Sequence, residues 1–71
     1  MLSYQEPLSP REEEVYQQLL TGKSIKAIAE TLFVAPSTIC TYTMRIYQKK
    51  QVNSRVELLS LKIEELKKQH D

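Results

Sequence analysis

The residues of this 71-residue chain that could do chemistry gather in a central segment without any acidic side chain. Between Thr31 and Val56 there is no Asp or Glu, although nine occur in the rest of the chain. The cations of this segment are Arg45, Lys49, Lys50 and Arg55. The formal net charge is only +1, so the positive field is local to this segment. Residues 36–50 have the pattern of a helix, and a basic helix with small polar side chains fits the major groove of DNA.

Other kinds of chemistry find little support in the residue types. Cys40 and His70 are the only residues of their kinds, so the sequence lacks the spacing of a metal site or a disulfide framework. A redox or metal-binding role for Cys40 is the alternative to a small, groove-facing residue. The run Glu12 to Glu14 fits the positive end of a helix better than acid catalysis. We therefore predict no catalytic residue, no metal, no cofactor and no small-molecule ligand, and that the chain is not an enzyme.

The length allows one domain near the lower limit for a self-sufficient core, so association with a second copy would add buried surface. No apolar run approaches the roughly 20 residues of a membrane span. The first residues also lack a signal pattern, so we expect a cytoplasmic protein without a membrane partner. We divide the chain into a flexible N-terminal tail at 1–7, a domain at 8–68 and a frayed C-terminus at 69–71.

Helical spacing and capping residues predict an all-α fold, a four-helix bundle-like domain. The first helix begins after Ser9 as N-cap, with Pro10 at its first position and Glu12 completing a capping box. Gly22 stops this helix, and Ser24 is the N-cap of the second. The apolar residues expected to face the core from these two helices are Val15, Leu19, Leu20, Ile25, Ile28, Ala29 and Leu32.

A short turn leads into the third predicted helix, residues 36–50, which has two different faces. The face expected in the core consists of Ile39, Tyr42, Thr43, Ile46 and Tyr47. The opposite face consists of Ser37, Thr41, Met44 and Gln48, flanked by Cys40 and Arg45. The second and third helices with their tight turn form a helix-turn-helix, which presents the polar face to base edges. The alternatives are an ordinary solvated face and stacking of the two tyrosines on bases.

A fourth helix is predicted from Ser54 to about Lys68, begun by a second capping box that Glu57 completes. One of its apolar stripes consists of Val56, Leu59, Ile63 and Leu66. A second stripe, Leu58 and Leu61, lies on nearly the opposite side. A helix at the edge of a small domain needs one stripe, so the other predicts a dimer interface, for which all six residues are candidates. Leu59→Asp or Leu61→Asp should then convert a dimer to a monomer, unless both stripes pack within one copy.

Several consecutive motifs resemble the LuxR/GerE-type DNA-binding domain, which also closes the NarL and FixJ class of response regulators. The matching segments are Leu8–Val15, Leu19–Ser24, Lys26–Glu30, Leu32–Val34, Ser37–Ile39, Lys49 and Val52–Glu57. Together they are far more specific than any one of them. The resemblance implies a bacterial, nucleoid-associated protein that binds promoter or operator DNA as a homodimer and controls transcription. RNA polymerase is a further candidate partner.

The resemblance also implies roles for single residues, with the outer face of the third helix in the major groove and the fourth helix at the dimer contact. The groove-facing positions are Cys40, Thr41, Met44 and Arg45. The positions that approach the DNA backbone are Thr38, Tyr42 and Lys49. With the remaining polar-face residues, the predicted DNA contacts are Lys26, Ser37, Thr38, Cys40, Thr41, Tyr42, Met44, Arg45, Gln48 and Lys49.

The chain departs from the family pattern at positions that matter for binding and stability. Cys40 and Met44 stand where the family often has basic or polar residues, so base readout can involve thymine methyl groups. Ala35 replaces the usual serine cap of the recognition helix, which should cost about 1 kcal/mol. Gln51 replaces a common glycine, at a cost of about 1 kcal/mol if its backbone is left-handed.

These observations predict a sequence-specific, double-stranded DNA-binding transcription regulator whose affinity falls steeply with salt. A different class remains as the alternative. A small helix-turn-helix protein can act by protein–protein interaction, as a heterodimerising antagonist or scaffold of a full-length regulator, without binding DNA itself. The sequence also leaves open whether the chain is a complete small regulator or the output domain of a longer one.

Overall fold

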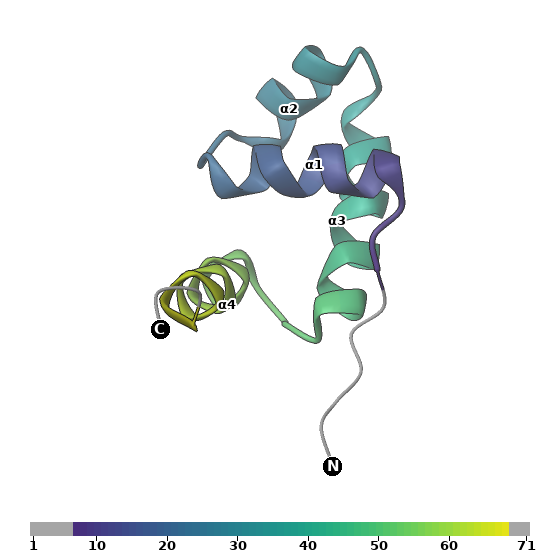
Figure 1. Cartoon of the computed structure of the whole chain (residues 1–71). Helices are drawn as coiled ribbons and strands as arrows, with labels where there is room; N and C mark the ends of the chain where they lie inside the picture. The colour runs from purple at the N-terminus through teal and green to yellow at the C-terminus, as the bar shows by residue number, and fades with distance from the viewer. Residues whose placement is uncertain (1–6, 69–71) are drawn as a thin grey trace.

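The computed structural model describes residues 7–68, and this part of the chain contains helices and no strands (Figure 1). The four helices are α1 (Pro10–Leu20), α2 (Ile25–Leu32), α3 (Pro36–Lys50) and α4 (Arg55–Lys68). The predicted all-α fold with four helices is thereby confirmed. The predicted frayed end, and the predicted tail apart from Pro7, lie outside the described residues.

The ends of α1 are fixed by the residues that the sequence indicated. The Ser9 hydroxyl accepts a hydrogen bond from the Glu12 N–H at 3.2 Å, and the Glu12 carboxylate accepts one from the Ser9 N–H at 2.9 Å. This capping box satisfies two helix-end donors reciprocally, with Pro10 at the first helical position. After the helix, Gly22 has φ +86°, a left-handed conformation that glycine adopts without steric cost.

Helices α2 and α3 both end on a left-handed residue other than glycine. Phe33 (φ 60°) caps α2, and Gln51 (φ 61°) caps α3. The following residue closes each end, as when the Val34 N–H donates to the Ala29 carbonyl at 3.0 Å. The N-cap of α3, Ala35, makes no side-chain cap hydrogen bond. The departures from ideal capping predicted at Ala35 and Gln51 are therefore both present, and each lowers the stability of the domain by about 1 kcal/mol.

Helix α3 is the central element, because both α1 and α2 pack against it (Figure 1). One buried face from each helix makes the core. Its members are Val15, Tyr16, Leu19, Ile28, Ala29, Ile39, Ile46 and Leu58. The other predicted core residues from the first two helices, Leu20, Ile25 and Leu32, are half-buried and pack against its edge. With its inner side fixed on two helices, α3 holds its other side in a constant orientation.

Helix α4 contacts α1 and corrects part of the dimer prediction. Leu58 is completely buried in the core of the monomer, so its assignment to a dimer interface is wrong. Leu61 is half-buried on the same inward side. The stripe left over is the other one, in which Val56 is 72 % exposed and Ile63 is 54 % exposed. Both stripes have helical spacing, and only the docking of α4 on α1 decides which one enters the core.

The start of α4 is also a variant of the predicted capping box. The Ser54 hydroxyl accepts a hydrogen bond from the Glu57 N–H at 3.2 Å, as the motif requires. The Glu57 carboxylate, however, accepts from the Asn53 N–H at 2.6 Å, one residue before the cap. The glutamate therefore ties the α3–α4 turn, as well as the helix start, to the first turn of α4.

Candidate nucleic-acid interface

The outer flank of α3 is open to solvent along its whole length. The predicted contact residues that are exposed are Lys26 of α2 and Ser37, Cys40, Thr41, Met44, Arg45 and Gln48 of α3. Ile39 and Ile46 on the inner flank are fully buried, as predicted. Because the polar flank is not covered by α4 or by any other described element, it is free to lie against a duplex.

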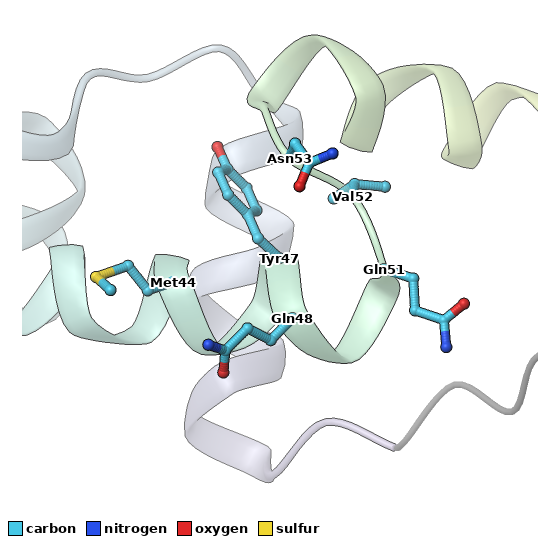
Figure 2. Close-up of a pocket in the computed structure, with 6 residues that line it drawn as sticks. All are labelled: Met44, Tyr47, Gln48, Gln51, Val52 and Asn53. Atoms are coloured by element: carbon cyan, nitrogen blue, oxygen red, sulfur yellow. The ribbon is translucent and has the colours of Figure 1, made fainter.

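The exposed flank carries mainly uncharged side chains. Met44 is 64 % exposed and lines two shallow grooves, one toward the α3–α4 turn and one toward α1 and α2. Figure 2 shows the first of these grooves, with Tyr47 and Gln48 projecting from different sides of α3. The Thr41 hydroxyl donates to the Ser37 carbonyl at 3.2 Å within the helix. Its hydrogen is therefore used by the backbone, which leaves a methyl group and an acceptor at this position.

Lys49 is committed to a carboxylate inside the molecule. Its ammonium donates to Glu12 Oε1 at 2.7 Å, where the Glu12 side chain is 4 % exposed and the Lys49 side chain 26 %. This hydrogen bond is the first cause that lowers the pKa of Glu12, followed by the Ser9 N–H. The pair joins the first turn of α1 to the last turn of α3. The structure thus places the predicted phosphate contact Lys49 in an internal ion pair, where it holds α3 in position against α1.

Two further cations of the acid-free segment also face inward. The Arg55 guanidinium donates to the Leu19 carbonyl through Nε at 3.0 Å and Nη2 at 2.7 Å. This carbonyl belongs to the last turn of α1, where backbone acceptors lack helical partners and the helix dipole favours a cation. Lys50 lies over the Tyr16 ring, with its Nζ 4.9 Å from the ring centroid. Among the four cations, Arg45 is the one on the exposed flank.

The remaining predicted contacts lie at the border of the flank. Thr38 and Tyr42 are half-buried, so each combines a packing contact with a partly accessible side chain. Tyr42 and Tyr47 both pack against the core. Burial raises the pKa of Tyr47. These positions agree with the prediction that the two tyrosines serve mainly the core, with Tyr42 near enough to the surface to approach a DNA backbone.

Sequence reasoning missed the residues that fix the helix-turn-helix turn. Arg11 of α1 donates through Nη2 to the Leu32 carbonyl at 3.2 Å, which satisfies an acceptor at the end of α2. Phe33, directly after it, is 92 % exposed. The only signal for the contact between Arg11 and Leu32 was an arginine in the opening turn of α1. Spacing along the chain could not reveal a partner 21 positions away.

Residues 7–68 contain neither a metal-binding cluster nor a membrane-spanning helix. No group of three or more His, Cys, Asp and Glu side chains there could hold a metal ion. No helix in that range combines the length and the apolar character that crossing a membrane requires.

Helices α2 and α3, joined by a short turn and with the outer flank of α3 exposed, have the arrangement of a helix-turn-helix. Residues 6–61 match the family described as "Bacterial regulatory proteins, luxR family", and the chain belongs to this family. The resemblance drawn from the motifs is thereby confirmed.

Known regulators share this part of the chain. It is 50 % identical over 48 residues to the "Probable transcriptional regulatory protein NarL" of Mycobacterium tuberculosis, covering 68 % of this chain and 22 % of that protein. It is 43 % identical over 54 residues to the "Transcriptional regulatory protein FixJ" of Bradyrhizobium diazoefficiens, covering 76 % of this chain and 26 % of that protein. The chain thus corresponds to about a quarter of these relatives, namely a helix-turn-helix domain of the transcription-regulator type.

Proposed function

We propose that this chain binds double-stranded DNA in a sequence-specific way, with α3 in the major groove, and thereby regulates transcription. The observation that carries the proposal is the outer flank of α3, which is exposed from Ser37 to Gln48 and has no carboxylate in its segment. Phosphates meet no repulsion from that segment, and the small side chains allow the helix backbone to approach base edges. Such a regulator acts at the chromosome in the bacterial cytoplasm.

The experiment is a binding titration of the purified chain against labelled promoter fragments at low salt, with fluorescence anisotropy as the readout. Arg45→Ala removes an exposed cation of the flank and should weaken binding while leaving stability within about 0.5 kcal/mol of wild type. Lys67→Ala is the matched control, because it removes one exposed cation from α4. Arg45→Ala should also make the dependence of log affinity on log salt shallower by about one per subunit.

The outcome of the titration separates the proposal from its alternative. Binding of promoter fragments, with Arg45→Ala weaker than Lys67→Ala, would support direct DNA binding through α3. No binding to any fragment at low salt would overturn the proposal and favour a protein–protein antagonist. The alternative draws on one observation: Lys49, Lys50 and Arg55 face inward, so the flank offers fewer cations than the sequence indicated.

We further propose that two copies bind as a symmetric homodimer through the exposed stripe of α4. Its members are Val56, Leu59, Ile63 and Leu66, which repeat with a 3-4-3 spacing; Leu59 is half-buried. An isologous contact between two such stripes would cover apolar surface that the monomer leaves in water. Two half-sites about one helical turn apart would then be expected on the DNA. Contact with RNA polymerase remains a prediction from the family resemblance.

Sedimentation velocity tests the dimer. Ile63→Asp places a charge in the centre of the stripe at a residue that is 54 % exposed, so the monomer should keep its fold and lose self-association. Gln17→Asp is the control, since it adds the same charge at an exposed position of α1. If wild type and Ile63→Asp sediment alike at every concentration up to that used for DNA binding, this interface is not formed.

A further inference from the structure

We infer that the recognition helix selects A·T pairs by contacting the C5-methyl group of thymine through Met44, an inference that rests on the proposed DNA binding. The flank offers base edges an exposed thioether, an exposed thiol at Cys40 and the methyl group of Thr41. Of the groups that a base pair presents in the major groove, the thymine methyl is the apolar one.

The internal contacts of the cations support the selection of A·T pairs, because few cations are left to read guanine. Readout of guanine in the major groove uses Arg or Lys, most often as a bidentate contact to O6 and N7. Lys49 is held by Glu12, Lys50 lies over the Tyr16 ring, and Arg55 is held by the Leu19 carbonyl. Arg45 is the exposed cation of the flank, so guanine readout by the described residues of α3 has at most this one side chain.

The hydrogen-bonding groups of the flank also favour A·T pairs over G·C pairs. The Thr41 hydroxyl already donates to the Ser37 carbonyl, so it does not offer its hydrogen to a base. Gln48 is exposed one turn beyond Met44, and a glutamine can bond adenine at N6 and N7 in a bidentate way. A thioether against a thymine methyl, with an amide on a neighbouring adenine, would select A·T pairs from two sides.

Met44 is well placed for such a contact, because it lines both grooves beside α3. The groove toward α1 and α2 has a volume of about 360 Å³, and Cys40 and Tyr47 also line it. The groove toward the α3–α4 turn has a volume of about 430 Å³ (Figure 2). A methyl group that touches Met44 therefore meets an apolar edge of the protein, and its removal from water is favourable.

The test replaces thymine by uracil, which pairs identically and lacks the methyl group. Duplexes are first selected by the purified chain from a random pool, and the same sequences are then amplified with either thymidine or deoxyuridine triphosphate. We expect the uracil duplexes to bind about fourfold more weakly for each contacted methyl, the effect of burying one such group. Met44→Gln, which has a similar length and a polar end, should bind both forms with nearly equal affinity.

Each outcome is decisive for one of the two proposals. Equal binding of thymine and uracil duplexes by the wild type would overturn the inference and leave DNA binding intact. An equal loss on uracil substitution in wild type and Met44→Gln would also overturn it, because the methyl would then act through DNA shape or another residue. Failure to select any duplex at low salt would overturn the proposed function, and the inference with it.

Discussion

Glu12→Gln tests the internal ion pair that fixes α3. Glu12 Oε1 accepts hydrogen bonds from Lys49 Nζ at 2.7 Å and from the Ser9 N–H at 2.9 Å. The amide keeps an oxygen for the Ser9 N–H but carries no charge for Lys49. Loss of a partner in a fully buried pair costs about 3–5 kcal/mol. The Lys49 side chain is 26 % exposed and can turn toward water, so we expect a loss of about 2 kcal/mol, as for one hydrogen bond to a charged group.

The assay is thermal unfolding followed by circular dichroism at neutral and acidic pH. A loss of about 2 kcal/mol in a domain of this size lowers the melting temperature by about 10 °C. The pKa of Glu12 lies below its ordinary value of 4.5, with the Lys49 hydrogen bond as the first cause. The unfolded chain therefore takes up this proton at higher pH than the folded chain. The contribution of the pair is complete above pH 4.5 and disappears as the pH falls through the lower pKa of the folded state.

The gap between wild type and Glu12→Gln should consequently be full at neutral pH and shrink in acid. Glu14→Gln is the control, since it removes a carboxylate of the same helix from an exposed pair with Arg11 at 2.7 Å. Exposed pairs contribute about 0.5 kcal/mol, so this variant should melt within a few degrees of wild type. If the two variants have the same melting temperature at neutral pH and lose stability in the same way as the pH falls, the ion pair does not stabilise the fold, and the reasoning is refuted.

Three further substitutions follow from the same contacts. Phe33→Gly should raise the free energy of unfolding by about 0.5 kcal/mol in urea titrations, because the Phe33 backbone is strained in the left-handed region and its exposed ring makes little packing. A decrease would show that the ring stabilises the turn. Ala35→Ser should add about 1 kcal/mol by supplying the missing cap of α3, and an unchanged urea midpoint would contradict this. Arg55→Ala should remove about 2 kcal/mol with its two bonds to the Leu19 carbonyl, whereas Arg45→Ala should leave stability within 0.5 kcal/mol; equal effects would contradict the inward and outward roles.

The helix boundaries were predictable from sequence because they depend on local chemistry. Ser9 and Ser24 cap helices through bonds that span three residues, and Gly22 occupies a left-handed position. The two flanks of α3 were predictable for a similar reason, since burial of Ile39 and Ile46 follows from helical spacing alone. These features are set within one helical turn, so a linear pattern contains them.

The partners of the charged residues were not predictable in this way. Lys49 and Glu12 are 37 positions apart, and Arg55 and Leu19 are 36 positions apart. A cation that binds a carboxylate inside the fold has the same sequence signature as one that binds a phosphate. Leu58 presents the same difficulty, because the inward side of α4 depends on how this helix docks against α1. Tertiary contacts decide these cases.

The inward cations change the physical meaning of the acid-free segment. Its positive charge is largely used within the fold, by a carboxylate of α1 and by the carbonyl of Leu19 at a helix end. Each use fixes α3 or α4 against α1 and so holds the outer flank in one orientation. What remains at the surface is a flank with few cations and no carboxylate, which neither repels phosphates nor binds them strongly. Under the proposed DNA binding, discrimination between sequences by such a flank comes mainly from contacts with base edges, and Met44 is its most exposed large apolar side chain.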